Sequence, residues 1–354
     1  MKILHVITSL SMGGAEHLLV DLLPRLKQNG HDVELVVFKG KRTAFYEQIE
    51  SAGIKIHSFS EKEGVYNLRH IFRLKKIMPY FDVVHTHNTA CQVFASIAKA
   101  KTNILITTEH STSTRRRKCF VFKYLDKIMY SQYDKIICIS KPCEDSLKRY
   151  IGFDFPLETV NNGVDVHRFS DADPFIFEFQ NSFVITMVAG FRYEKDQPTL
   201  IRSLLYLPNN FHVVLVGDGE KRVEIENLIS ELKLGSRVHL FGLRTDVPNI
   251  LKSSNVIVMS SHREGLSLSN VEGMASGNPF IASDVEGLRE VTAGYGLLFP
   301  HGDSQQLASI IKKLHDNPVF AHQVSVKCKE RALQFDISNM VNGYLRIYNE
   351  LMKF

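Results

Sequence analysis

The fold is indicated most clearly by residues 256–272, which read VIVMSSHREGLSLSNVE. The four apolar residues Val256 to Met259 have the length and composition of a buried strand in a parallel sheet. A polar loop containing Gly265 follows, and a helix is expected to begin near Ser267 to Asn270, because serine and asparagine favour the first position of a helix. The stretch therefore predicts one strand, loop and helix unit of a parallel α/β sheet.

The same unit carries two carboxylates that are eight residues apart. Glu264 lies before the expected helix, and Glu272 lies about one turn inside it. Free amides at a helix N-terminus can bind phosphate, and carboxylates on either side accept hydrogen bonds from hydroxyl groups such as those of a sugar or a ribose. The alternative interpretation is two glutamates that only cap the helix and face solvent.

Similar units run along almost the whole chain, because strand-sized apolar runs alternate with amphipathic stretches. In the first half we expect strands at residues 2–7, 33–38, 83–85, 104–108 and 135–139. In the second half we expect them at residues 183–189, 213–216, 237–240, 256–259 and 280–282. A polar stretch between Asn161 and Asn181 interrupts the pattern and reads as loop and linker.

The chain is thus predicted to be α/β, with two doubly wound Rossmann-like domains that face a cleft. We expect the first domain over residues 1–165, a linker over 166–182 and the second domain over 183–336. Ligands of open parallel sheets bind beyond the carboxyl ends of the strands. The chemistry is therefore expected in the loops that follow the strands.

Composition and charge exclude several classes of protein. Apolar residues make up 44% of the 354 residues and charged residues 23%, which excludes a disordered or fibrous chain. A net charge of +5 favours anionic partners but does not indicate nucleic acid. The longest apolar runs are strand-sized, so no membrane-spanning segment is expected. Five cysteines without a metal-binding spacing fit a reducing cytoplasm and do not indicate zinc.

Two further loops have features of phosphate binding. Gly13 and Gly14 lie between the first strand and the first helix, where glycine permits close approach of a ligand to the helix N-terminus. A plain tight turn is the alternative, since the dinucleotide-binding spacing is absent. Lys195 lies just before a helix that Pro198 can start, and this position suits a diphosphate; a solvated basic loop is the alternative.

A family resemblance rests on these motifs in their order: Gly13-Gly14, Asn162-Gly163-Val164-Asp165, the Lys195 loop, Val216-Gly217-Asp218-Gly219 and the segment from Glu264 to Glu272. Together they resemble the retaining glycosyltransferases of family 4, which have the GT-B fold. The resemblance covers nearly the whole chain. It implies transfer of a sugar from a UDP-sugar or GDP-sugar with retention at the anomeric carbon, without a metal or other cofactor. It also implies that the last helix, within residues 337–354, returns to the first domain.

The expected acceptor is a glycan or a lipid-linked molecule in the synthesis of bacterial surface polysaccharide. The protein is then expected in the cytoplasm, peripherally on the inner face of the membrane. Two alternatives share the two-domain plan: a sugar-nucleotide epimerase and a non-catalytic nucleotide-sugar binder.

The resemblance also implies roles for individual residues. It places three residues at the reaction centre: His110, Lys195 and Glu264. It places the donor on Gly14, Arg192, Leu243, Arg244, Ser269, Asn270 and Glu272. The acceptor side is expected at Glu16, His87 and Asn88, and no residue is expected to bind a metal. For His110, a loop histidine packed at a strand end is the alternative.

One position departs from the family pattern. Gly190 stands where the family usually carries an arginine, five residues before Lys195. Arg192 is the nearest candidate to replace that arginine, but the sequence leaves open whether it does. Helix amides or a first-domain residue such as Arg116 are alternatives.

Histidines and basic runs in the first half complete the candidate features. His85 and His87 are expected to point to opposite sides of a strand end, so that they do not share a metal ion. One of them is expected to face the acceptor together with Asn88, or else to be packed. The cations of residues 115–118 and 69–76 form either a solvated face or a contact with an anionic membrane surface.

Overall fold

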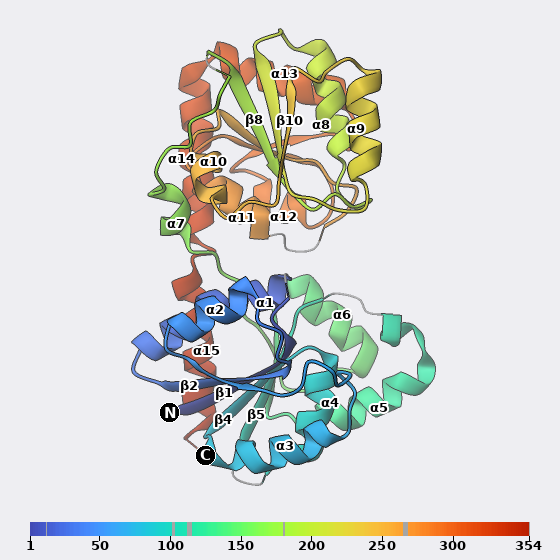
Figure 1. Ribbon diagram of the computed structural model, residues 1–354, viewed down its shortest axis with the longest axis vertical. Helices are drawn as coiled ribbons and strands as arrows, with labels where there is room; N and C mark the ends of the chain where they lie inside the picture. The colour runs from blue at the N-terminus through green and yellow to red at the C-terminus, as the bar shows by residue number, and fades with distance from the viewer. Residues whose placement is uncertain (12, 101–102, 112–114, 180, 265–267, 354) are drawn as a thin grey trace. The chain divides into compact units, whose positions relative to one another are not determined.

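The computed structural model describes the chain except for residues 12, 101–102, 112–114, 180, 265–267 and 354. The chain divides into two compact units. The first comprises Met1–Gly163 and Ile337–Phe354, and the second comprises Val164–Asp336. Each unit is built around one parallel sheet, so the predicted α/β class with two doubly wound domains is confirmed (Figure 1).

The first unit contains a seven-stranded sheet in the order β3-β2-β1-β4-β5-β6-β7. Its strands are β1 (Lys2–Ser9), β2 (Asp32–Lys39), β3 (Lys55–Ser58), β4 (Val83–His87), β5 (Ile104–Glu109), β6 (Lys135–Cys138) and β7 (Leu157–Thr159). Every pair in the sheet is parallel. The strand order turns back at β1, and this reversal makes the domain doubly wound.

Helices cover both faces of this sheet because successive strand residues point to opposite sides. Ile3 and Ile7 of β1 pack on one face, and Leu4 and Val6 pack on the other. The first face is covered by α1 (Gly14–Gln28), α2 (Ala44–Ser51) and α15 (Ile337–Leu351). The second face is covered by α3 (Arg69–Ile77), α4 (Thr89–Ala98), α5 (Phe120–Tyr130) and α6 (Lys141–Ile151). Short 3-10 turns occur at η1 (Met78–Tyr80) and η2 (Arg115–Lys118).

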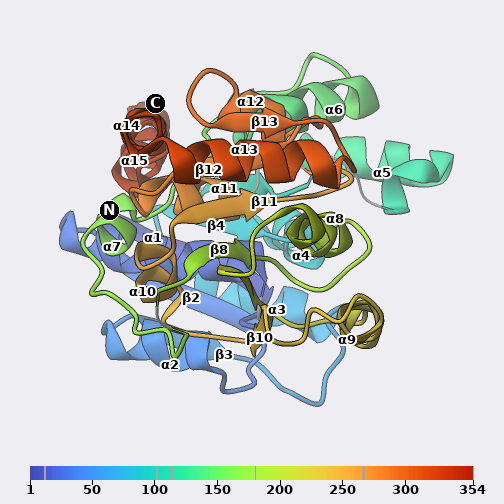
Figure 2. The same ribbon diagram turned by 90° about the horizontal axis from the view of Figure 1, so that it is seen from above.

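The second unit contains a six-stranded parallel sheet in the order β10-β9-β8-β11-β12-β13. Its strands are β8 (Phe183–Val188), β9 (Phe211–Val216), β10 (Val238–Gly242), β11 (Val256–Met259), β12 (Phe280–Ser283) and β13 (Leu297–Phe299). Its helices are α7 (Val166–Ser170), α8 (Gln197–Ser203), η3 (Leu204–Tyr206), α9 (Arg222–Glu231), α10 (Val247–Lys252), α11 (Leu268–Ala275), α12 (Leu288–Thr292), α13 (Ser304–Asp316) and α14 (Pro318–Leu333). Helices α8 and α13 pack against each other (Figure 2).

Residues 166–182, where the sequence predicts a linker, belong to this second unit. They begin with α7, which packs against α10 and α11. Phe175, Phe177 and Phe179 then pack against the small core cluster around Val184 and Val214. Within the described residues, the helices lack the combination of length and apolar character that crossing a bilayer requires.

Candidate active site

Lys195 and Glu264 meet where strands β8 and β11 end. The Lys195 ammonium forms an ion pair with Oε1 of Glu264, and the Ser261 hydroxyl donates to the same oxygen at 3.0 Å. The lysine side chain is 19% exposed and the glutamate side chain 13%. Backbone hydrogen bonds join the two loops, because the Asp196 amide donates to the Ser260 carbonyl at 3.0 Å. The structure therefore brings together two of the three residues that the sequence places at the reaction centre.

The β9 loop needs glycine for a steric reason. Gly217 has a φ of +139°, and a Cβ there would lie 2.1 Å from the Ala189 carbonyl oxygen. A Cβ at Gly219 would lie 2.4 Å from the Phe191 carbonyl oxygen. The two glycines thus let the β9 loop pack directly against the β8 loop that carries Lys195.

Helix α11 follows Glu264 and presents an unpartnered amide side chain near its start. Asn270 is fully buried, and neither its Oδ1 nor its Nδ2 has a hydrogen-bond partner in the described part of the chain. A buried polar group of this kind is usually satisfied by a ligand or by water. Ser269 and Glu272 lie on the same helix and are partly exposed. The predicted loop glycine Gly265 and helix start Ser267 lie outside the described residues.

Arg192 and Lys195 line one cavity of about 510 Å³, in whose wall four cations outnumber two carboxylates. The other charged residues of the wall are Arg202, Lys221, Glu224 and Glu231. Arg192 is exposed. Gly190 leaves room for a side chain, because a Cβ there would meet only Arg192 Nε at 3.7 Å and the Asp218 carbonyl oxygen at 3.8 Å. The cations and the cavity volume suit a phosphate-containing ligand.

Leu243 and Arg244 lie after β10, and Arg244 lines a second hollow. Leu243 is exposed. The Arg244 guanidinium binds both carboxylate oxygens of Asp246, with Nε to Oδ1 at 2.8 Å and a terminal nitrogen to Oδ2 at 2.6 Å. The hollow measures about 500 Å³, and its lining includes Phe175, Phe179, His239, Phe241 and Arg244. Its aromatic walls and cation suit a flat ring.

In the first unit, four histidines from β1, β4 and the residue after β5 lie together, and we call them the histidine stack; the rings of His5, His85 and His87 are stacked, and that of His110 is tilted against His87. His5 Nδ1 lies 3.0 Å from His87 Nε2, and His87 Nδ1 lies 3.0 Å from His110 Nε2. The His85 ring stacks on those of His5 and His87, with centroid distances of 5.0 and 4.6 Å. His85 also hydrogen-bonds to Thr108 at 2.7 Å and to Tyr348 of α15 at 2.5 Å.

The expectation that His85 and His87 point to opposite sides is wrong. The two residues are two positions apart on β4, and side chains at this spacing share one face of a strand. Ring nitrogens of His5, His85 and His87 lie within 4.8 Å of one another, so the geometric objection to a shared metal does not hold. The observed contacts are instead hydrogen bonds between rings. The second unit contains another group of side chains whose potential ligand atoms lie within 4.8 Å of one another: Asp196, His262 and His301.

Burial keeps the histidine stack uncharged. It lowers the pKa of His5 to about 3 and that of His110 to about 4. It also lowers the pKa of His85 and of His87 well below the ordinary value, and the neighbouring histidines add to this effect. All four rings are therefore neutral at pH 7.

The remaining predicted residues of the first unit lie at the start of α1 and α4. Glu16 lies in the first turn of α1, and burial raises the pKa of its carboxyl, an effect that the neighbouring Asn88 side chain partly offsets. Asn88 has a φ of +73° and donates to the Thr8 hydroxyl at 3.0 Å. Gly14 is exposed, and a Cβ there would meet no atom within 4 Å. Glu16 and Asn88 are therefore close enough for the Asn88 side chain to influence the pKa of Glu16, whereas His87 is fully buried among the other histidines.

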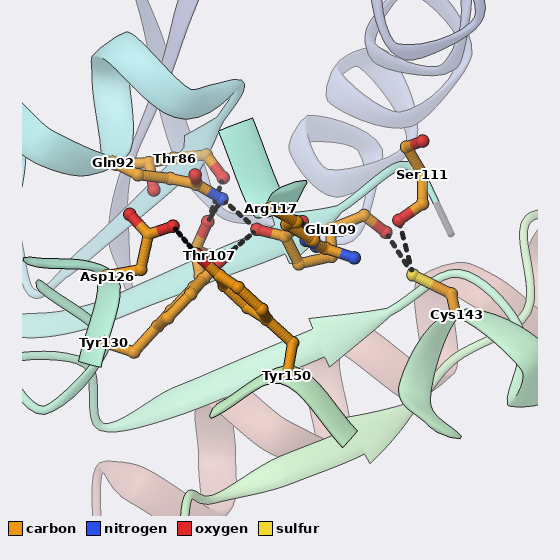
Figure 3. A network of polar contacts seen from close by, with 10 residues as sticks. All are labelled: Thr86, Gln92, Thr107, Glu109, Ser111, Arg117, Asp126, Tyr130, Cys143 and Tyr150. Carbon is orange, nitrogen blue, oxygen red and sulfur yellow. Dashed lines mark hydrogen bonds and ion pairs between the residues drawn. The ribbon is translucent and has the colours of Figure 1, made fainter. Parts of the chain in front are cut away.

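Sequence reasoning missed a polar network around Glu109, the residue before His110 (Figure 3). The Glu109 carboxylate accepts hydrogen bonds from Tyr130 at 2.6 Å and from Gln92 at 2.5 Å, and it forms an ion pair with Arg117 at 2.7 Å. Cys143 Sγ donates to the Ser111 carbonyl at 3.3 Å. These contacts anchor the chain on both sides of His110.

The run of cations at 115–118 is not a fully solvated face. Arg117 pairs with Glu109, and Arg116 forms an ion pair with Asp126 of α5. Both arginines are largely covered, with side-chain exposures of 10% and 22%. Arg116 is therefore already engaged within the first unit. A pairing between distant residues leaves no local signal that sequence reasoning could use.

Helix α5 exposes a row of apolar side chains next to this network. Val121, Tyr124, Leu125 and Ile128 follow the i, i+3, i+4, i+7 spacing of one helix face and are each at least half exposed. We call these four residues the α5 stripe. Lys123 and Lys127 lie on the same helix and are partly exposed. An exposed apolar row of this size marks an interaction surface.

Comparison with known families matches both halves of the chain. The family described as Glycosyltransferase Family 4 matches residues 12–168, and that described as Glycosyl transferases group 1 matches residues 170–335. A UDP-Gal:alpha-D-GlcNAc-diphosphoundecaprenol alpha-1,3-galactosyltransferase of Escherichia coli is 26% identical over 80% of this chain and 78% of its own. An alpha-1,4-N-acetyl-D-galactosaminyltransferase of Campylobacter jejuni, named for an acceptor on diphosphoundecaprenol, is 22% identical over 99% of both chains.

Solved structures of the same fold cover the whole chain. Anabaena HepE in complex with UDP and glucose superposes with a TM-score of 0.83, at 20% identity over 99% of both chains. A glycosyltransferase from Rickettsia africae gives a TM-score of 0.85, at 21% identity over 99% of this chain and 98% of its own. Both likenesses establish the GT-B fold.

Proposed function

This chain belongs to the glycosyltransferases of family 4, and from this premise we propose a specific reaction for it. It moves a sugar from a UDP-sugar or GDP-sugar to a glycan or lipid-linked acceptor, with retention at the anomeric carbon and without a metal ion or other cofactor. The observation that carries the proposal is the Lys195 and Glu264 pair beside the start of α11. In this pair, a cation that suits a diphosphate lies next to a carboxylate that can accept hydrogen bonds from sugar hydroxyl groups, and this supports the proposal.

In the proposed mechanism, the main task of the protein is to stabilise charge on the leaving diphosphate. The bond between the anomeric carbon and the phosphate oxygen breaks, and the acceptor oxygen attacks from the same face. The acceptor proton passes to the departing phosphate oxygen. Lys195, Arg192 and the amides of α11 stabilise the negative charge that develops there. Donors that already point at this charge before the reaction lower the activation barrier, because they need no rearrangement in the transition state.

Glu264 and Glu272 take different parts in this scheme. Glu264 accepts hydrogen bonds from hydroxyl groups of the donor sugar, and Glu272 accepts them from the ribose. Leu243 and Arg244 border the base in this scheme, and Arg244 lines the second hollow with its aromatic walls. These assignments rest on the family resemblance, and the Lys195 contact of Glu264 supports the first of them.

We also propose that the acceptor is carried by a lipid and met at an anionic membrane surface on the cytoplasmic side. Two relatives are named for acceptors linked to diphosphoundecaprenol. The α5 stripe supplies apolar side chains that can enter the interface of a bilayer, and Lys123 and Lys127 suit its anionic headgroups. This surface replaces the run at 115–118, two of whose cations are paired internally.

A donor panel tests the reaction class. Purified protein is incubated with radiolabelled UDP-sugars and GDP-sugars in the presence of a chelator, with and without polyprenyl-diphosphate glycans in vesicles. Transfer, with slow donor hydrolysis when acceptor is omitted, supports the proposal, and NMR of the product reports the anomeric configuration. Formation of a 2-epimer would instead indicate an epimerase, and binding without turnover would indicate an inert binder. Dependence on the metal that the chelator removes would contradict the metal-free mechanism.

A further inference from the structure

His5, His87 and His110 form a continuous hydrogen-bonded chain of three imidazole rings in the first unit. The two links, His5 to His87 and His87 to His110, both measure 3.0 Å. His5 and His87 are fully buried, whereas His110 is partly exposed. The chain therefore runs from the core of the unit to a ring that a ligand can reach.

We propose that this chain fixes the tautomer of His110, so that its Nδ1 carries the proton and its Nε2 accepts a hydrogen bond from His87. His110 then acts as a hydrogen-bond donor and not as a proton-accepting base. His87 and His5 are positioning residues that act through it. The role of His110 at the reaction centre rests on the proposed function, but the tautomer itself does not.

The argument starts from the buried end of the chain. A neutral imidazole has one N–H group and one bare nitrogen, so three linked neutral rings must all point their protons in the same direction. If the protons point inward, that is from His110 toward His5, then His5 Nε2 carries a hydrogen. This atom is buried without a partner among the described residues. An unpartnered buried N–H is rare and unfavourable. If they point outward, His5 Nε2 is bare and the last N–H is that of His110 Nδ1.

The residues around the three rings keep them neutral and hold them in position. Burial lowers the pKa of His5 to about 3 and that of His110 to about 4. His85 stacks on His5 and on His87, and both of its own nitrogens are engaged by Thr108 and Tyr348. The network of Glu109 holds the backbone beside His110. The outward direction is therefore built into the fold before any ligand binds.

A fixed N–H at His110 Nδ1 fits one class of ligand group. It donates to an oxygen with a lone pair, such as a sugar hydroxyl or a phosphate oxygen. It cannot remove a proton from the acceptor. This agrees with the proposed mechanism, in which the departing phosphate takes that proton.

NMR of the full chain labelled with ¹⁵N-histidine tests the tautomer directly. Long-range ¹H–¹⁵N correlation distinguishes a protonated ring nitrogen from a bare one, and the His110 signals are those lost in His110→Gln. In the unliganded protein we expect His110 in the Nδ1–H form. We call the directed hydrogen bonds from His5 through His87 to His110 the histidine relay. Free histidine favours the Nε2–H form, so a predominant Nε2–H signal for His110 would overturn this relay.

Two substitutions of His87 separate the relay from simple packing. His87→Leu cannot donate to His110, and we expect its His110 signal to shift toward Nε2–H and kcat to fall about tenfold with KM little changed. His87→Gln can accept and donate, and we expect it to restore the Nδ1–H form and most of kcat. A His87→Leu protein that keeps the Nδ1–H form would refute the relay, as would a His87→Gln protein that loses it.

A matched control breaks a similar contact elsewhere. His212 Nδ1 lies 2.9 Å from His239 Nε2 in the second unit, so His212→Leu removes a histidine pair without touching the relay. We expect it to leave the His110 tautomer unchanged. Because the tautomer is read without substrate, a protein that transfers no sugar would count against the proposed function and leave the relay to be decided by NMR.

Discussion

Lys195 and Glu264 neutralise each other across two loops that lie 69 residues apart in the sequence. In the unliganded second unit, the cation expected on the diphosphate is thus paired with the carboxylate expected on the sugar. A nucleotide-sugar can replace both halves of this pair, because its phosphate meets the lysine and its hydroxyl groups meet the glutamate. The pair therefore keeps two partly buried charges satisfied until the donor binds.

This relationship predicts opposite effects for two glutamate substitutions. Glu264→Gln frees Lys195 for phosphate, so UDP affinity should stay within about threefold of wild type or increase, while transfer should fall by about two orders of magnitude or more. Glu272→Gln should instead weaken UDP binding about tenfold. Calorimetric titration with UDP and initial-rate assays measure both quantities. Equal loss of UDP binding in the two variants would contradict this division of roles.

A second prediction concerns the departure at Gly190. Arg192 lines the same cavity as Lys195, and a cation there contributes charge-assisted hydrogen bonds to a diphosphate. Arg192→Ala should therefore lower kcat/KM by about one to two orders of magnitude, about as much as Lys195→Ala. Gly190→Arg in the Arg192→Ala background should restore part of this loss, because a Cβ at Gly190 meets only ordinary contacts.

The matched control for Arg192 is Arg263, an exposed arginine nearby that pairs with Glu194 at 3.3 Å. Arg263→Ala should leave kcat/KM close to wild type. Full activity in Arg192→Ala would show that helix amides complete the phosphate site without a second side-chain cation.

The elements that sequence predicts well are those whose signal is local. Buried parallel strands are continuous apolar runs, and Val256 to Met259 forms β11 with the predicted bounds. The edge strands β3 (Lys55–Ser58) and β13 (Leu297–Phe299) are short and partly exposed. A search for continuous apolar runs therefore does not predict them. Helix α7 lies inside a stretch whose proline and asparagine residues predict a loop.

In the candidate site too, features with a local sequence signal can be predicted, whereas contacts between distant residues cannot. Loop motifs such as the Lys195 segment are local and can be recognised in the sequence. The partners of Arg116 and Arg117 come from α5 and β5, and a run of cations looks solvated until those partners are known. The error over His85 and His87 has a different origin, because the period of two along a strand already places them on one face.

The α5 stripe predicts how the protein meets a membrane. Replacing Tyr124, Leu125 and Ile128 with Ser should abolish flotation with anionic vesicles and lower transfer to a vesicle-bound acceptor at least about tenfold, because apolar burial drives most of such binding. Donor hydrolysis without acceptor should be unchanged. The control is Val319→Ser, which removes a single exposed apolar side chain from α14 in the second unit. Unchanged flotation of the triple variant would exclude α5 as the contact.

The last prediction is the pH dependence of stability that the histidine stack imposes. The pKa of His5 is about 3 and that of His110 about 4 in the folded protein, against an unfolded value of about 6.5. Between these limits the unfolded chain binds more protons, so the free energy of unfolding is highest above pH 6.5 and falls as the pH decreases toward 4. Each histidine contributes a loss of about 1.4 kcal/mol per pH unit, or about 2 kcal/mol between pH 6.5 and pH 5.

Urea unfolding followed by circular dichroism at these two pH values should show a smaller loss of unfolding free energy in His5→Leu than in wild type. The control variant is His322→Leu, which removes an exposed histidine outside the stack. An identical pH dependence in His5→Leu and wild type would mean that the buried rings do not resist protonation, and the neutral relay would fail with them.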